Sequence, residues 1–235
     1  MKILTVTSSF LILVYASYGQ ETVFQNLDFE QAQPVSAGAN MVTEASALPG
    51  WTVYCGTEVQ TAVYENVYAL NQATADIFGP SYPVAGPTSG GLPGRIDGNY
   101  TAVIQPGVQS INPLTFVSTS LEQTGTIPVG DDSLVFKAWG AGADSFSVSF
   151  AGNNLSLIDL GSGPNYTLYG ADISSYAGQT GLLDFTANVQ AAPSLLALDD
   201  IAFSTTAAPE PNSLVLTGIG GLVFASYRRF APKRS

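Results

Sequence analysis

The chain has 235 residues, of which 46% are hydrophobic and 11% charged, so it can bury an ordinary core within one domain. Its 24 Gly and 14 Pro favour many turns, which are more typical of β-structure than of helical bundles. The chain contains no His and a single cysteine, Cys55. These counts exclude a Ser-His-Asp triad, a His-based zinc site, a Cys-His pair and an intramolecular disulfide. We expect Cys55 to be a buried free thiol, with pairing between chains as the alternative.

Charge is distributed unevenly along the sequence. Five of the seven basic residues lie in the two ends, which leaves two, Arg95 and Lys137, between Gln20 and Ala208. The same span holds 17 of the 18 acidic residues, so two positive charges stand against 17 negative ones. Such a body repels phosphate groups, and we expect no binding of nucleic acid. It suits divalent cations, which prefer carboxylate oxygen.

Residues 1–19 have the pattern of a secretory signal peptide. Lys2 gives a positive start, and residues 3–14 are mostly apolar but too few to span a membrane. Ser17 and Gly19 are small residues at the third and first positions before Gln20, which predicts cleavage before Gln20. The alternative is a buried N-terminal strand.

Residues 20–205 are predicted to form one all-β domain, a single antiparallel β-sandwich of the jelly-roll type. Apolar and polar residues alternate in short segments separated by turn residues, and no repeat of 20–50 residues recurs. The clearest predicted strands are residues 99–105, 133–139, 145–150, 155–158, 182–189 and 194–203.

Residues 79–94 form a long irregular stretch rich in Gly and Pro, which predicts a surface loop. The loop is either a flexible excursion or the lip of a binding site. Within it we select Tyr82 as a candidate sugar contact. Trp51 and Trp139 lie in apolar segments and are predicted to belong to the core.

After a short linker at residues 206–208, the last 27 residues combine three features. Pro209-Glu210-Pro211 precedes an uncharged stretch from Leu214 to Tyr227, and a basic cluster begins at Arg228-Arg229. The uncharged stretch predicts a transmembrane helix. Its length would be roughly 21 Å, which is short against the ~30 Å hydrocarbon core. The basic cluster predicts a cytoplasmic C-terminus and an acidic body on the other side of the membrane.

This tail resembles the PEP-CTERM sorting signal of Gram-negative bacteria. The resemblance implies recognition by an exosortase, a membrane protease that cuts near Pro209-Glu210-Pro211, with Arg228 and Arg229 as the basic cluster. It also implies an exported protein that is tethered to the inner membrane before processing. The protein would then reach the cell surface or extracellular matrix, in association with exopolysaccharide and biofilm. A GPI signal and a plain C-terminal anchor are the alternatives.

The body carries a second resemblance. Asn26-Leu27-Asp28-Phe29-Glu30, followed by Leu48-Pro49-Gly50-Trp51, resembles the opening of galactose-binding-like jelly rolls, a fold shared by many carbohydrate-binding modules. Residues 97–107, 121–124, 172–179 and 197–201 resemble its later parts, whereas Leu27 stands where Gly is usual. The fold alone does not imply sugar binding.

The second resemblance implies that the first and last strands lie side by side. Asp28 and Glu30 would then approach Asp199 and Asp200, and four carboxylates repel one another unless a cation or protons compensate. We therefore expect structural calcium there, with Glu30 and either Asp199 or Asp200 as the ligands that the resemblance implies. Strand alternation lets at most one of Asp199 and Asp200 point inward, and exposed edge-strand carboxylates are the alternative.

Together these features predict a non-enzymatic surface or matrix protein. Two alternatives stay open, namely a lectin-like module for polysaccharide and an unrecognised polysaccharide hydrolase. No motif marks a pair of acidic residues as the acid and nucleophile that glycoside hydrolysis requires, so we do not expect an enzyme.

Overall fold

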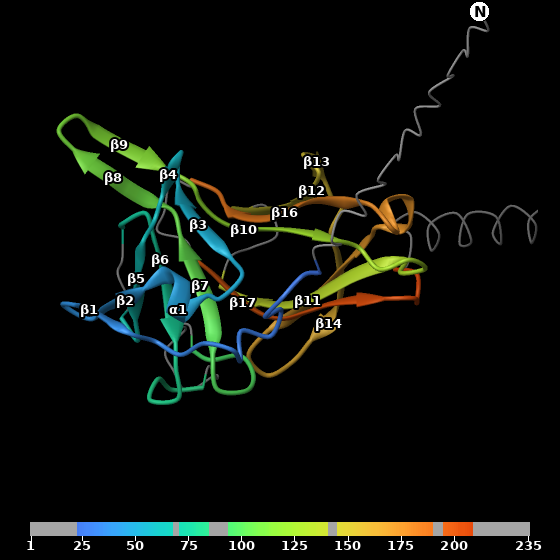
Figure 1. The fold of residues 1–235 in the computed structure, drawn as a ribbon, viewed down its shortest axis with the longest axis horizontal. Coiled ribbons are helices and arrows are strands. Elements are labelled where there is room, and N and C mark those ends of the chain that lie inside the picture. The colour runs from blue at the N-terminus through green and yellow to red at the C-terminus, as the bar shows by residue number, and fades with distance from the viewer. Residues whose placement is uncertain (1–22, 68–70, 85–93, 141–144, 190–194, 209–235) are drawn as a thin grey trace, which may run out of the picture.

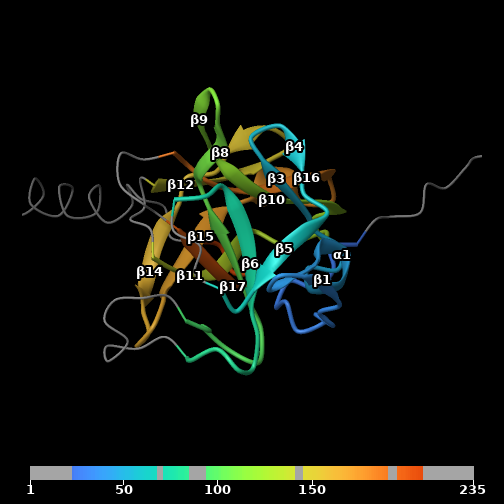
Figure 2. The same ribbon diagram turned by 90° about the vertical axis from the view of Figure 1, so that its left-hand side faces the viewer.

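The computed structural model describes residues 23–67, 71–84, 94–140, 145–189 and 195–208. These residues form a β-sandwich in which two large sheets face each other and a small hairpin projects from one end (Figures 1 and 2). The described residues include two short helical segments, α1 (Glu44–Ala47) and a 3-10 turn (Ser174–Tyr176). The all-β prediction is confirmed.

The larger sheet has nine strands within the described residues, in the order β1-β2-β5-β6-β7-β17-β11-β15-β14. They are β1 (Ser36–Gly38), β2 (Met41–Thr43), β5 (Ala62–Glu65), β6 (Thr74–Phe78), β7 (Thr101–Gln105), β17 (Leu196–Ser204), β11 (Ser133–Trp139), β15 (Thr167–Asp172) and β14 (Ile158–Ser162). The expectation of a wholly antiparallel sandwich is wrong at one pair, because β5 and β6 are parallel. The chain between them returns to the end of the sheet at which β5 began.

The smaller sheet has six strands within the described residues, in the order β13-β12-β16-β10-β3-β4. They are β13 (Asn153–Asn154), β12 (Phe146–Phe150), β16 (Thr180–Ala187), β10 (Thr119–Thr126), β3 (Thr52–Cys55) and β4 (Glu58–Val59). The projecting hairpin consists of β8 (Gly107–Ile111) and β9 (Leu114–Val117). It lies beside the β3–β4 hairpin in both views (Figures 1 and 2).

The core between the sheets follows from alternation along the strands. In β12 the side chains of Phe146, Val148 and Phe150 are buried, whereas the serines between them are half-buried. Phe136 and Phe185, one from each sheet, meet edge-to-face with ring centroids 5.1 Å apart. Burying each such ring stabilises the fold by about 2–3 kcal/mol. The sandwich therefore has one continuous core that includes Trp51, as predicted.

A second, smaller hydrophobic cluster lies on the outer face of the nine-stranded sheet. Phe78, Val103 and Ala197 alternate with core residues on β6, β7 and β17, and so they point away from the main core. Ile96 and Leu195 complete this cluster, and Tyr82, Trp139 and Tyr166 pack against it while half-buried. Trp139 thus belongs to this outer cluster and not to the main core. Cys55 is a buried free thiol, as predicted.

The expected first strand at residues 26–30 is wrong. Asn26 and Phe29 have φ values of 51° and 58°, which an extended strand does not allow, and the segment forms consecutive turns. The Asn26 carbonyl accepts a hydrogen bond from the Trp51 indole at 3.0 Å, which holds the turn against the core. The segment still lies beside β17, because the Ile201 N–H donates to the Leu27 carbonyl at 3.0 Å.

Candidate functional site

The predicted sorting and targeting residues lie outside the described residues. They are the signal peptide at 1–19, Pro209, Glu210, Pro211, Arg228, Arg229 and the expected membrane helix. Within the part of the chain that the structure describes, no helix has the length and apolar character needed to cross a bilayer. The sorting interpretation therefore stays a prediction.

The carboxylate of Glu30 accepts hydrogen bonds from three N–H groups. Its Oε1 accepts from the backbone N–H groups of Asn99 and Tyr100 at 2.6 and 2.9 Å, and its Oε2 accepts from the Asn99 amide at 3.0 Å. The exposed Asp28 accepts from the Glu30 N–H at 3.3 Å and lines a shallow hollow of about 450 Å³ together with Asp200. Glu30 therefore secures the turn before β7, which is a structural role.

Asp199 and Asp200 form a β-bulge in β17. Asp199 pairs with Lys137 of β11 and Ala202 pairs with Val135, so β17 has two residues between these paired positions where β11 has one. The extra residue, Asp200, has a φ of 47°. Asp199 is 1% exposed and accepts from the Thr101 hydroxyl at 2.6 Å, the Asp97 N–H at 3.2 Å and the Asp200 N–H at 2.9 Å. Burial raises its pKa to about 7, although these donors oppose the shift.

Lys137 lies between two carboxylates of this region. Its ammonium contacts Asp97 Oδ2 at 2.6 Å, bonds Asp200 Oδ2, and lies 5.0 Å from the centre of the Tyr166 ring. Burial lowers the pKa of Lys137, but the two carboxylates outweigh this effect and hold that pKa above its usual value. The hydrogen bond from Lys137 likewise keeps the pKa of Asp97 low. We call Glu30, Asp97, Lys137, Asp199 and Asp200 the charge cluster.

The charge cluster does not fit a calcium ion. Calcium requires six to eight oxygen ligands, whereas these carboxylates already accept from N–H groups, a hydroxyl and an ammonium. Among the described residues, no group of three or more acidic, His or Cys side chains is placed to hold a metal ion. Calcium binding by Asp28, Glu30, Asp199 and Asp200 stays a prediction that this arrangement does not support.

Tyr82 lies on the outer cluster and is half-buried. Its ring stacks on Phe78 with centroids 3.9 Å apart and planes inclined by 15°, and its carbonyl accepts from Arg95 Nε at 2.9 Å. One face of the ring is therefore covered by protein. A sugar would have to use the other face, which makes Tyr82 a weaker sugar platform than the sequence indicated.

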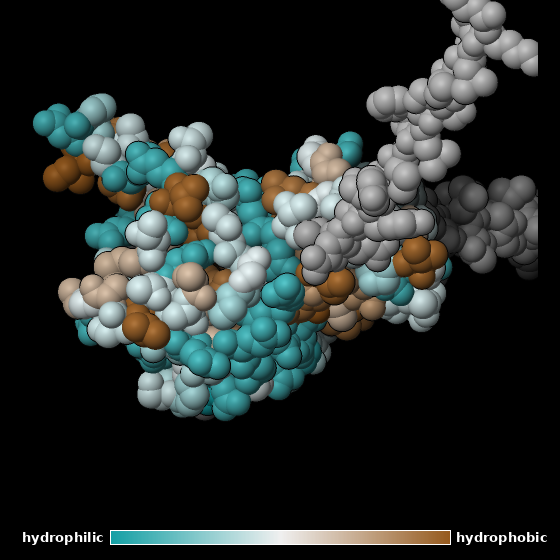
Figure 3. All heavy atoms as spheres, in the orientation of Figure 1, coloured by the Kyte–Doolittle hydropathy of each residue, from teal (hydrophilic) through white to brown (hydrophobic). Residues whose placement is uncertain are grey.

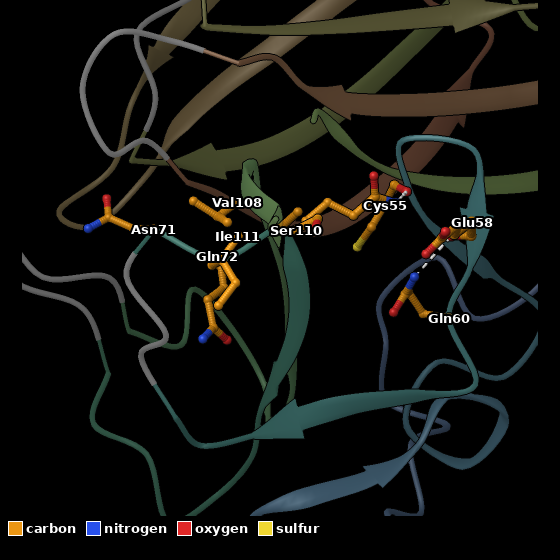
Figure 4. A pocket seen from close by; sticks show the side chains of 10 residues that line it. Cys55, Glu58, Gln60, Asn71, Gln72, Val108, Ser110 and Ile111 are labelled. Carbon is orange, nitrogen blue, oxygen red and sulfur yellow. Dashed lines mark hydrogen bonds between the residues drawn. The ribbon is translucent and has the colours of Figure 1, made fainter. Parts of the chain in front are cut away.

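A groove of about 750 Å³ opens at the hairpin end of the sandwich (Figure 4). Three segments far apart in the sequence form its walls: the β3–β4 hairpin, residues 71–73 and strand β8. Sequence reasoning missed this groove, because no local motif marks it. Its lining residues are Cys55, Glu58, Gln60, Asn71, Gln72, Ala73, Val108, Gln109, Ser110 and Ile111.

Polar side chains dominate the groove, and three of its four amide side chains are supported by a hydrogen bond. Tyr64 donates to Gln72 Oε1 at 3.3 Å, Gln109 Nε2 donates to the Cys55 carbonyl at 2.9 Å, and Gln60 Nε2 donates to the Glu58 carbonyl at 3.0 Å. Within the described residues this leaves Gln72 Nε2 as a donor, and Gln60 Oε1 and Gln109 Oε1 as acceptors, without protein partners. Sugar hydroxyls both donate and accept, so they match such a mixed set.

The hairpin gives the groove an apolar wall. Val108 and Ile111 line it, and Phe116 and Leu114 are their partners across the hairpin, so all four side chains share one face. Ile111, Leu114 and Phe116 are 85%, 61% and 55% exposed. Figure 3 shows brown, apolar surface near the projecting end of the molecule. Phe116 is thus an exposed aromatic ring on the hairpin that contributes β8 to the groove, and the C–H face of a sugar could pack on it.

Two glycines hold the groove together. A Cβ on Gly107 would lie 2.6 Å from the backbone of Asn71, whose carbonyl accepts from the Val108 N–H at 2.8 Å. A Cβ on Gly56, which has a φ of 62°, would lie 3.1 Å from Val117 of the hairpin. Close backbone approach at Gly107 therefore sets the distance between residues 71–73 and β8.

The carboxyl groups with raised pKa values lie elsewhere. Burial raises the pKa of Asp76 to about 8 and those of Glu44 and Asp199 to about 7, and it also raises the pKa of Asp184. None of the four lines the groove. Glu58 is the acidic residue among the described lining residues. Glycoside hydrolysis needs two carboxyl groups about 5–10 Å apart. The described lining residues of the groove therefore include one carboxyl group, that of Glu58, and not a pair.

Comparison with known proteins gives little further guidance. No protein-family model matches the sequence, and no curated protein matches it. One solved structure is similar, that of the carbohydrate-binding module TmCBM61 in complex with β-1,4-galactotriose. The sequence identity is 12%, the match covers 78% of this chain and 98% of the other, and the TM-score is 0.41. Similarity at this level supports no argument about function.

Proposed function

We propose that this chain is an exported, non-enzymatic surface protein whose β-sandwich binds polysaccharide. The observation that carries the proposal is the groove at the hairpin end, where supported amides lie near the apolar residues Val108 and Ile111 of a hairpin that also exposes Phe116. Amides that keep unused donors and acceptors, next to an apolar surface, match the alternating hydroxyl and C–H faces of a sugar chain.

The position of the groove supports a surface role. The hairpin lies at one end of the long axis in Figure 1, and the last described residues, 204–208, lie toward the other end. A sandwich tethered through its C-terminus would therefore present the groove away from the tether. The tether itself is the predicted segment 209–235, with an exosortase as the proposed partner protease and exopolysaccharide as the proposed ligand.

The test is a glycan array probed with the full chain, kept soluble in a detergent that contains no sugar. We expect binding to at least one polysaccharide, and a loss of about tenfold in affinity for Phe116→Ala, because a stacked sugar ring contributes on the order of 1.4 kcal/mol. Tyr82→Ala is the matched control, an aromatic truncation at the sequence-predicted position.

Two results would contradict the proposal. Absence of glycan binding would remove the function itself, and a larger loss for Tyr82→Ala than for Phe116→Ala would move the site to the outer cluster. Release of reducing sugars from the bound polysaccharide would favour the hydrolase alternative. The sorting part is tested separately, by the mass of the protein released from cells, which should end near Pro209.

A further inference from the structure

We propose that the groove selects polysaccharides with free amino groups, that is, hexosamine polymers whose substituent is an ammonium and neither an acetamide nor a carboxylate. This inference rests on the proposed function and specifies its ligand. It is argued from the charge inside the groove, the positions of the basic residues and the way in which Glu58 is displayed.

The charge among the described lining residues of the groove is negative and comes from Glu58. Glu58 is exposed, and its carboxylate has no hydrogen-bond or ion-pair partner among the described residues. The other polar lining residues are amides and a serine, which are neutral. A ligand with an ammonium group would supply the partner that this carboxylate lacks, through a charge-assisted hydrogen bond.

The basic residues of the described chain are committed elsewhere. Arg95 donates to the carbonyls of Tyr82 and Gly98 at 2.9 and 2.5 Å, and Lys137 bonds Asp97 and Asp200. Neither lines the groove. Nothing in the described lining can therefore neutralise a uronic acid or a sulfate, and the acidic body would repel such polymers further.

The β3–β4 hairpin holds Glu58 in place. Cys55 and Glu58 are cross-strand partners, and the Gly56 N–H donates to the Ser118 carbonyl at 2.8 Å. Gln60 Nε2 fixes the Glu58 carbonyl at 3.0 Å. The backbone of Glu58 is thus tied to β3 and to its own strand, while the carboxylate stays exposed at the groove wall opposite β8.

The experiment measures the affinity of the full chain, in sugar-free detergent at pH 6, for three tetrasaccharides: glucosamine, N-acetylglucosamine and a uronic acid. Short ligands limit the non-specific attraction between a polycation and an acidic protein. We expect the glucosamine tetramer to bind about tenfold more tightly than its acetylated form, and the uronic acid tetramer not to bind. Glu58→Gln should abolish this preference, because it should weaken binding of the glucosamine tetramer about tenfold.

Asp131→Asn is the matched control, because it removes one negative charge from the β10–β11 turn at the end of the sandwich away from the hairpin. Equal losses for Glu58→Gln and Asp131→Asn would show a general charge effect and overturn the inference. Equal binding of both hexosamine tetramers, or a preference for the uronic acid, would also overturn it while leaving the proposed function intact. Binding of no glycan at all, on the array or here, would remove both.

Discussion

Two regions of the molecule concentrate polar side chains, and they differ in how those side chains are satisfied. The charge cluster lies on the outer side of the nine-stranded sheet, where Asp199 accepts three hydrogen bonds and Lys137 contacts two carboxylates. In the groove, Glu58 has no partner among the described residues, and the three supported amides each keep an unused polar atom. Strand β7 connects the regions, since Thr101 at its start donates to Asp199 of the charge cluster and Gln105 at its end precedes β8 of the groove.

This difference separates structural polarity from polarity available to a ligand. A buried polar group must be bonded within the protein, because leaving it unpaired costs about 1–3 kcal/mol. An exposed polar group in a groove costs little while water solvates it, and it can exchange that water for a ligand. In the sequence, polar groups of both kinds are acidic and amide residues. The hydrogen-bond partners in the structure distinguish the structural polar groups from those that are available to a ligand.

Substitution of Gly107 should produce the largest effect on the groove. In Gly107→Ala the new Cβ would meet the backbone of Asn71 at 2.6 Å, so residues 71–73 must move away from β8. We expect a loss of about 3 kcal/mol in the free energy of unfolding, from urea denaturation, and at least a tenfold loss of glycan affinity. Thr115→Ala, in the partner strand of the hairpin, is the control and should preserve both. Full glycan affinity in Gly107→Ala would mean that residues 71–73 do not form the site.

The outer face should control how stability depends on pH. Asp76 is 4% exposed, and burial raises its pKa to about 8. The folded chain therefore binds more protons than the unfolded chain between about pH 4 and pH 8, and stability falls as pH rises through that window. We expect wild type to lose about 2 kcal/mol between pH 5 and pH 8, by urea denaturation.

Asp76→Asn keeps an acceptor for the Val67 N–H and carries no charge, so its stability should change less over the same range. Asp131→Asn, in the turn between β10 and β11, should retain the wild-type slope. A pH dependence in Asp76→Asn as steep as in wild type would assign the effect to Glu44 and Asp199.

The sequence predicted the strands that alternate cleanly and misjudged those governed by tertiary contacts. Residues 145–150 alternate strictly and are β12 to within one residue, and the largely apolar segment 133–139, which ends at Gly140, is β11. The β8–β9 hairpin was missed because its apolar residues sit on an exposed face and its connection contains Pro113, so neither burial nor alternation marks it. The bulge at Asp199–Asp200 is likewise invisible to a strict period of two.

The candidate site was less predictable than the fold. The predicted carboxylates do approach β17, as the Leu27–Ile201 hydrogen bond requires, but N–H groups and Lys137 satisfy them. The groove draws on three segments separated by ten residues or more. The exposed aromatic residue of the hairpin, Phe116, has no sequence feature that distinguishes it from a core Phe. A site formed by the packing of separate hairpins can be recognised only once that packing is known.

The smallest expected effect on stability comes from removing the Lys137 charge, which should alter the charge cluster and leave the groove unchanged. Lys137→Met keeps a stem against Tyr166 and removes the ammonium between Asp97 and Asp200. Those carboxylates are 58% and 39% exposed, so water screens their repulsion, and we expect a loss of about 1 kcal/mol in stability, or roughly 3 °C in Tm. High salt should narrow the difference from wild type, because it screens the pair. Glycan affinity should stay within twofold of wild type, and a large loss would mean that the charge cluster, rather than the groove, contacts the ligand.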